Sequence, residues 1–248
     1  MKLIAAVAFC LTLLSPFVSR AALQLPKSLT QPDREEALRI VGFGTAAKIL
    51  SDPYPLGGYA GLEVGFSLES VPAEDLGRLG ARLQSPQQDV SLPKFTIGKG
   101  LYNDVDVFIH FTPYTRQDEL AQYGGMLRWG FYQAAFLPLS LSVLAHMNSN
   151  NIGNLLTTNT YGGDFIGGIN VENVALFAGG GMVESTGTFS GDIAAAEGAE
   201  IKGSIKRETV SGTHTVIGAN IHFSNIFLAI QIDRYTLPVF SGKLGVRF

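Results

Sequence analysis

Six charged residues stand at alternate positions within apolar segments, and they are the residues best placed for chemistry. Alternation with period two is typical of a β-strand with one apolar and one polar face, so these charges would share the polar face. Charges that are buried together must form pairs, because an unpaired buried charge is costly. The pattern predicts either a structural cluster of ion pairs or a charged constriction that selects solutes. The six residues are Glu63, Asp104, Asp106, Arg128, Lys243 and Arg247.

Groups capable of acid–base or nucleophilic catalysis share two of these segments. A hydrolase needs a nucleophile within hydrogen-bond reach of a base, but His and Ser are also ordinary residues of a polar interior, and we predict no catalytic residue. The chain's four histidines lack the spacing of metal ligands, so we predict no metal site and no cofactor. The catalytic candidates are Asp104, Asp106 and His110 on one segment and Ser140, Ser142 and His146 on the other.

The run from Gly42 to Ala47 reads G-x-G-x-x-A, which is the spacing of a dinucleotide-binding loop. Such a loop needs a complete βαβ unit, and Asp52-Pro53 would end a helix after one or two turns. The run is therefore better interpreted as part of a short amphipathic helix from about Asp33 to Leu50, with Asp33 as its N-cap.

The composition limits which elements can position these residues. The 248 residues are 46% apolar and 16% charged, with a formal net charge of −3. These values argue against disorder, which needs low hydrophobicity, and against nucleic-acid binding, which needs a basic surface. A helical membrane protein needs apolar runs of about 20 residues. The one candidate, Trp129–Met147, contains Pro138 and alternates like a strand from Leu137 onward.

Alternation recurs in segments of about ten residues, the length of a tilted strand that crosses a bilayer. Lipid offers no hydrogen bonds to a free strand edge, so such strands must close into a barrel. In a soluble sandwich the apolar face would contact a second sheet instead, and that alternative stays open. We predict an all-β fold, a transmembrane antiparallel up-and-down β-barrel of about ten strands (eight or twelve as alternatives) with a short N-terminal helix. The expected strands lie near 58–70, 91–98, 100–111, 119–133, 137–148, 155–167, 171–186, 200–223, 226–235 and 238–248.

The predicted connections alternate in length, which favours the membrane barrel. If both termini are periplasmic, the longer connections fall outside and the tight ones inside, as in outer-membrane barrels. The final outer connection, 236–237, is short. The tight connections are at Lys99, 134–136, 168–170 and 224–225, and the longer ones are at 71–90, 112–118, 149–154 and 187–199.

The first 21 residues have the layout of a secretory signal peptide. Lys2 precedes an uncharged, mostly apolar run, and Ser19 and Ala21 are the small residues expected before a cleavage site. The only cysteine, Cys10, lies within this run, so the exported chain would contain no disulfide. The predicted division is a signal peptide at 1–21, an N-terminal segment at 22–56 that lies at the periplasmic mouth or partly plugs the barrel, and the barrel at 57–248.

The C-terminus resembles the closing strand of bacterial outer-membrane β-barrel proteins. Chains of that family end on an aromatic residue with apolar residues at alternate positions before it. Here Phe240, Leu244, Val246 and Phe248 match that pattern, and Gly242 departs from it. The resemblance implies recognition of this stripe by the barrel-assembly machinery and a location in the bacterial outer membrane, in contact with its lipid.

The expected function is a small porin-like channel or transport-type barrel for small solutes, with the inward charges as its filter. One alternative is a closed structural barrel that acts through its extracellular loops, and a less favoured one is a barrel hydrolase.

Overall fold

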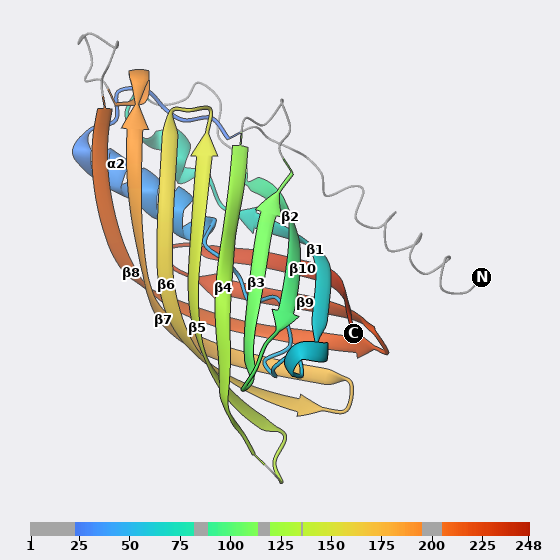
Figure 1. Ribbon diagram of the computed structural model, residues 1–248. Helices are drawn as coiled ribbons and strands as arrows, with labels where there is room; N and C mark the ends of the chain where they lie inside the picture. Colours follow the sequence, from blue (N-terminus) through green and yellow to red (C-terminus); the bar gives the residue numbers. More distant parts are fainter. Residues whose placement is uncertain (1–22, 82–88, 114–119, 135, 195–204) are drawn as a thin grey trace.

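The computed structural model describes residues 23–81, 89–113, 120–134, 136–194 and 205–248, and it shows a closed barrel (Figure 1). Each strand pairs antiparallel with its neighbours in sequence, and β1 pairs with β10 to close the sheet. The prediction of an all-β, up-and-down barrel of about ten strands is confirmed, whereas the predicted signal peptide at 1–21 lies outside the described residues. The strands are β1 (Leu62–Val71), β2 (Val90–Gly100), β3 (Val105–Thr112), β4 (Leu120–Gln133), β5 (Leu139–Ile152), β6 (Leu156–Val171), β7 (Val174–Ser190), β8 (Ile205–Phe223), β9 (Ile226–Arg234) and β10 (Pro238–Arg247).

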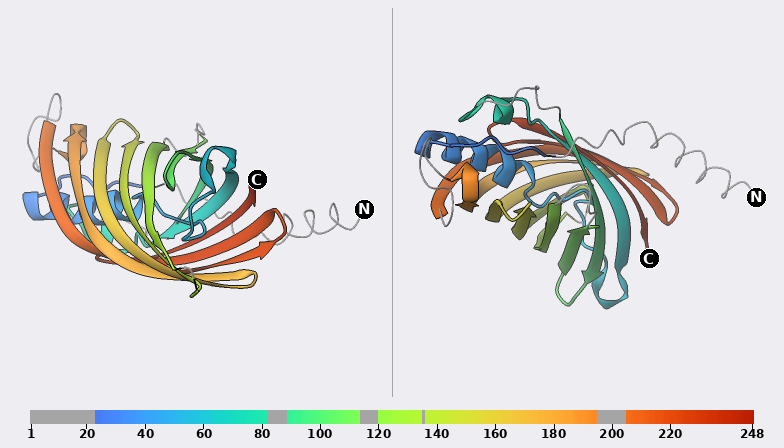
Figure 2. Two further views of the ribbon diagram at one scale, coloured as in Figure 1. Left: turned by 60° about the horizontal axis from the view of Figure 1, so that its bottom comes forward. Right: turned by 90° about the horizontal axis from the view of Figure 1, so that it is seen from above.

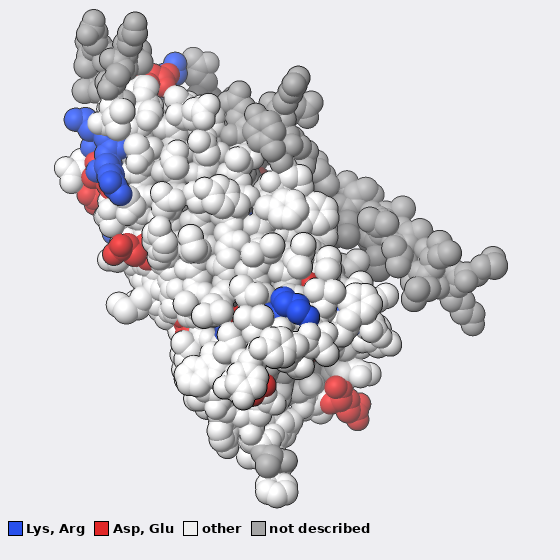
Figure 3. All heavy atoms as spheres, in the orientation of Figure 1, with Lys and Arg blue, Asp and Glu red and all other residues white. Residues whose placement is uncertain are grey.

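Side chains alternate between the lumen and the outer surface, as the sequence predicts. Glu63 is fully buried in the lumen, while Val107 and Ile230 are 36% and 57% exposed on the outer face. The apolar faces therefore point away from the barrel and not toward a second sheet, which excludes the soluble sandwich. Figure 3 shows one side of this outer surface, where charged side chains are sparse across the middle and gather near the start of β8.

The two ends of the barrel differ. The first residues of β1 pair with the last of β10, for example Glu63 with Arg247, so both lie at one end. This turn-bearing end also carries the connections 101–104, 134–138, 172–173 and 224–225. The loop-bearing end carries the connections 72–89, 113–119, 153–155, 191–204 and 235–237, of which 153–155 and 235–237 are short.

The tight connection predicted at Lys99 is wrong, because β2 continues to Gly100 and the chain reverses at 101–104. Asn103 and Asp104 both have positive φ, at 52° and 57°, and Asn and Asp tolerate this conformation better than most residues. Asp104 is therefore an exposed turn residue and does not face the lumen.

The helix is shorter than predicted and begins earlier. Helix α2 (Gln31–Leu38) is capped by Thr30 and not by Asp33, because the side chains of these two residues form a capping box. A π-helical turn, η2 (Arg39–Phe43), continues it, and beyond Ala46 the chain is not helical as far as Leu50. Gly42 and Gly44 permit close packing here, since a Cβ on either would lie 2.2 Å from Ser185 Oγ or 2.5 Å from Val71 Cγ1.

The barrel wall is taller on one side than on the other. Strands β4 to β8 have 14 to 19 residues, whereas the other five have 8 to 11. Helix α2 lies against the inner face of the tall side, where Arg34 forms an ion pair with Glu208 of β8 (Figure 2). Segment 72–81, with its short helix η4 (Asp75–Arg78), contributes Ala73 and Leu76 to the same buried apolar cluster as Leu38 of α2.

We call this cluster at the loop-bearing end the cap. Its members are Leu29, Ala37, Leu38, Ile40, Val41, Phe43, Val71, Ala73, Leu76, Val90, Leu92, Leu120, Ile152, Leu156, Val183, Phe189, Ile193, Ala194, Val210 and Val239. In the described part of the chain, no helix has the length and apolar character needed to cross a membrane.

Candidate functional site in the barrel lumen

The lumen is occupied by the chain's own residues 39–57, which we call the plug. From the end of α2 the plug runs lengthwise through the barrel and meets β1 at the turn-bearing end through the single turn η3 (Gly58–Ala60). Its apolar residues are buried, for example Ile49 at 5% and Leu56 at 7% exposure. Of the two predicted places for the N-terminal segment, the structure therefore shows the plug, while α2 lies at the loop-bearing mouth and not at the end where β1 begins.

Below the cap, Thr45 of the plug is held by amide side chains from the wall. Its carbonyl oxygen accepts hydrogen bonds from Gln122 Nε2 at 2.8 Å and Asn148 Nδ2 at 2.9 Å, and its hydroxyl accepts one from Asn150 Nδ2 at 2.7 Å. All three amides face inward on β4 and β5 and are buried. Such satisfied contacts fix the plug in register with the wall.

A buried carboxylate beside this point balances two lysines. Glu69 of β1 contacts Lys94 of β2 at 2.7 Å and Lys48 of the plug at 3.9 Å. Lys48 Nζ also donates to the backbone oxygens of Gly44 and Ala46 within the plug.

His214 of β8 lies between two carboxylates in the middle of the lumen. Its Nδ1 is 2.7 Å from Asp164 Oδ1 and its Nε2 is 2.8 Å from Asp233 Oδ1. This arrangement favours the imidazolium cation, because an ionised carboxylate only accepts hydrogen bonds and each ring nitrogen faces a carboxylate oxygen.

The Tyr235 ring stacks on His214 at 4.3 Å, with Lys48 on the same ring at 5.1 Å. Burial raises the pKa of the Tyr235 phenol well above its usual value, and the nearby carboxylates act in the same direction. The phenol is therefore neutral here.

Nearer the turn-bearing end, Glu63 joins the wall to the plug. It contacts Lys243 at 2.7 Å and Arg247 at 3.2 Å, and it accepts a hydrogen bond of 2.7 Å from the plug's Ser51 hydroxyl. The next plug residue, Asp52, contacts His222 at 2.8 Å and Arg247 at 3.3 Å.

Arg128 and Asp106 form the last ion pair of the series. Two guanidinium nitrogens of Arg128 contact Asp106 Oδ2 at 2.7 and 2.9 Å, and Arg128 also donates to the backbone oxygen of Asp52. Asp106 accepts the Leu56 backbone N–H at 3.1 Å. Wall and plug therefore complete each other's hydrogen bonds at this level.

Charges in the plugged lumen balance. Six carboxylates are matched by five lysine or arginine side chains together with the His214 imidazolium. The carboxylates are Asp52, Glu63, Glu69, Asp106, Asp164 and Asp233, and the cations are Lys48, Lys94, Arg128, Lys243, Arg247 and His214. Every one of them has an oppositely charged neighbour within 4 Å, as the cost of an unpaired buried charge requires.

Five of the six predicted inward charges are in this set, and Asp104 is not. Sequence reasoning missed Glu69, Lys94 and Asp233, although each stands at an inward position of its strand, so the alternation contained the signal. It also missed Asp164, because the glycines around it obscure the apolar face of β6. No local pattern indicates that Lys48 and Asp52 enter the lumen.

The catalytic candidates are not brought together. His110 hydrogen-bonds Asn148 at 3.0 Å, and Asp106 is engaged by Arg128. His146 is 3.3 Å from Asp164, and neither of them contacts a serine hydroxyl in the described hydrogen bonds. Among the described residues, no group of three or more His, Cys, Asp or Glu is arranged to hold a metal ion.

The predicted assembly stripe faces outward on β10. Phe240 and Phe248 are 55% and 65% exposed, and Leu244 and Val246 are half-buried between neighbouring strands. The stripe is therefore accessible on the outer surface of β10, beside the pairing with β1 that closes the barrel.

No protein-family model and no curated protein matches the sequence. Among solved structures, the chain is similar to the N-terminal β-barrel domain of Pseudomonas aeruginosa OprF, with 14% identity over 77% of this chain and 99% of that chain and a TM-score of 0.34. It is also similar to Ail, the attachment invasion locus protein of Yersinia pestis, with 11% identity over 76% and 97% of the two chains and a TM-score of 0.32. Omp33, an outer membrane protein of Acinetobacter baumannii, is similar at 9% identity over 79% and 98% with a TM-score of 0.32.

The chain resembles bacterial outer-membrane β-barrel proteins. Identities and TM-scores this low carry nothing about function, and the fold rests on the closed strand pairing described above. No narrower family follows from these similarities.

Proposed function

We propose that this chain is an integral outer-membrane β-barrel whose lumen is closed by its own N-terminal segment, and that it acts through the capped, loop-bearing end. The observation that carries the closed state is the plug. Its apolar residues are buried, and the charges predicted to line a pore instead pair with one another and with the plug. This favours the structural interpretation of those charges over a solute filter.

A change of outward-facing residues along β7 supports the membrane. Leu176 and Met182 are 48% and 73% exposed, but the next outward positions toward the loop-bearing end are Glu184, Thr186 and Thr188. Neighbouring β8 changes from Ile217 near its middle to Thr209 and Arg207 toward the loop-bearing end, with the apolar Ile205 as its first residue. An apolar belt that gives way to polar residues on one strand is the expected result of crossing from hydrocarbon into water.

The proposal includes two partners. Outer-membrane lipid contacts the belt, and the barrel-assembly machinery recognises the outward stripe Phe240, Leu244, Val246 and Phe248 on the closing strand. It assigns no catalytic residue and no nucleic-acid partner.

Conductance across planar lipid bilayers tests the closed lumen. The full mature chain is expected to insert with no conductance above background, and a variant that lacks residues 23–56 is expected to conduct. Folding of each variant is checked by the difference in gel migration between unheated and boiled samples, because a closed barrel resists detergent until heated.

A second variant serves if the deletion does not fold. Asp52→Ala removes the plug carboxylate that holds His222 and Arg247 and is expected to give brief openings. Glu74→Ala, in an exposed loop, is the matched control and should remain silent. Steady conductance by the unaltered chain would contradict the closed lumen and restore the porin-like channel for small solutes.

A further inference from the structure

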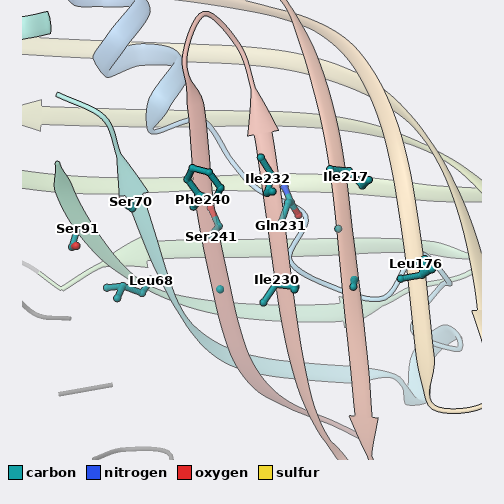
Figure 4. A pocket seen from close by; sticks show the side chains of 13 residues that line it. Leu68, Ser70, Ser91, Leu176, Ile217, Ile230, Gln231, Ile232, Phe240 and Ser241 are labelled. Carbon is teal, nitrogen blue, oxygen red and sulfur yellow. The ribbon is translucent and has the colours of Figure 1, made fainter. Parts of the chain in front are cut away.

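An apolar groove of about 730 Å³ lies on the outer face of the barrel, across the short strands β1, β10 and β9 and the adjoining tall strands β8 and β7 (Figure 4). Strand pairing places five of its residues in one row across β1, β10, β9, β8 and β7. Large and small side chains alternate along this row, so two gaps flank the central isoleucine. The row is Leu68, Gly242, Ile230, Ala219 and Leu176.

The next row toward the loop-bearing end forms the upper part of the groove. Phe240, Ile232 and Ile217 continue the apolar wall, and the paired residues Ser70 and Ser91 place two hydroxyl groups at its edge. None of the described residues that line the groove is charged.

An arginine stands directly above this row. Arg234 is the next outward residue after Ile232, it pairs with Thr215 and Pro238, and its side chain is exposed. Unlike the paired arginines of the lumen, Arg234 forms no ion pair with any residue that the structure describes. A free guanidinium at the upper edge of an apolar groove is complementary to an anionic headgroup above an acyl chain.

We propose that this groove binds one membrane lipid with a phosphate headgroup, its acyl chain in the gaps at Gly242 and Ala219 and its phosphate on Arg234. A guanidinium can bind a phosphate through two parallel hydrogen bonds, which gives it geometric preference over a neutral headgroup. Ser70 and Ser91 are placed to donate to headgroup oxygens. The inference rests on the proposed function, because it requires this outer face to lie in a membrane.

Lipid retention by the full mature chain tests the groove. The protein is inserted into vesicles of phosphatidylcholine with a minor share of phosphatidylglycerol, extracted gently, and analysed by native mass spectrometry. The unaltered chain is expected to retain one phosphatidylglycerol molecule. Arg234→Gln is expected to lower that retention about tenfold, because it removes a charge-assisted hydrogen bond.

Two further variants separate charge from shape. Arg207→Gln removes another exposed arginine without an ion pair among the described residues, but it lies on β8 far beyond the groove and should leave retention unchanged. Gly242→Phe fills a gap; a Cβ there lies 3.8 Å from Ala229 O, so the substitution fits the fold. It is expected to abolish retention while Arg234 is intact.

Three results would overturn the groove assignment. Equal retention of phosphatidylcholine and phosphatidylglycerol, or equal losses in Arg234→Gln and Arg207→Gln, would remove the headgroup site. A dimer that Gly242→Phe disrupts would assign the groove to a second copy of the chain. If the protein inserts as a heat-resistant barrel, these results reject only the groove; if it does not insert, the proposed membrane function fails as well.

Discussion

The two halves of the barrel interior hold the N-terminal segment by different chemistry. At the loop-bearing end, Leu38 of α2 packs in the cap against apolar side chains such as Leu76 and Phe189, and each of the three is at 0% exposure. Toward the turn-bearing end, ion pairs around Glu63 and Arg128 join wall and plug, beside a smaller apolar cluster that includes Phe108 and Ile166.

The difference follows from what lies outside each half. Where the wall crosses the belt, its outward positions are apolar, and much of its inward face is left to polar residues that must be paired. Where β7 and β8 project beyond the belt, the outward residues are polar except Ile205, and Val183, Phe189 and Val210 turn inward to build an ordinary core. A single strand therefore has an apolar outer face where it contacts hydrocarbon and an apolar inner face where it contacts water.

The largest expected effect comes from breaking a buried ion pair in the half of the barrel toward the turn-bearing end. Arg128→Met leaves Asp106 buried without its partner and should lower the free energy of unfolding by about 3–5 kcal/mol. Urea unfolding in lipid vesicles measures this, with Arg207→Met as the exposed control. The double variant Arg128→Met/Asp106→Leu should regain part of the loss, and no recovery would show that the pairing is not what matters.

A cavity in the cap should cost slightly less. Leu38→Ala removes a fully buried side chain from the packing between α2 and β7 and should lower the free energy of unfolding by about 3 kcal/mol. Because Leu38→Ala leaves no charge unpaired, a second substitution at a neighbouring residue should not restore stability in the way that Asp106→Leu does for Arg128→Met. If Leu38→Ala lowered the free energy of unfolding by less than the substitution of an exposed residue does, the cap would not be a packed core.

The sequence predicts an element well when nearby residues determine it and poorly when contacts distant in sequence determine it. Strands such as β5 and β9 follow from local alternation, because every second side chain meets the same medium. The reversal at Asp104 depends on two positive φ values, and the N-cap at Thr30 depends on a reciprocal side-chain contact; both were placed wrongly. The plug is beyond local patterns, since its partners lie as far away in sequence as Arg247.

Loss of the helix cap should have a smaller effect. Thr30→Ala removes the side chain that accepts from the Asp33 backbone N–H, and about 1 kcal/mol of stability should be lost. The measurement is the urea midpoint of the same vesicle preparation. Thr30→Ser keeps the hydroxyl and should behave like the unaltered chain; if it loses as much as Thr30→Ala, the capping box is not the cause.

The smallest effect is expected at the outer edge of the cap. Lys27 contacts Asp192 at 2.9 Å, and this hydrogen bond together with the opposite charge raises the pKa of the Lys27 amine. The pair is exposed to solvent, which screens it, so Lys27→Met should not change the urea midpoint measurably. A clear shift of the urea midpoint would show that ion pairs stabilise the edge of the cap, as they stabilise the half of the barrel toward the turn-bearing end.

The most direct test of the plug is a disulfide between it and the wall. A Cβ built on Gly44 lies 3.7 Å from Val71 Cβ, a normal separation for a disulfide. The double variant Gly44→Cys/Val71→Cys is oxidised in the membrane, unfolded in denaturant without reductant, and treated with maleimide. Neither of its cysteines is expected to be labelled, whereas both cysteines of Gly44→Cys/Val64→Cys, with Val64 on the outer face, should be labelled. If Gly44→Cys/Val71→Cys stays fully reactive, the N-terminal segment does not occupy the lumen.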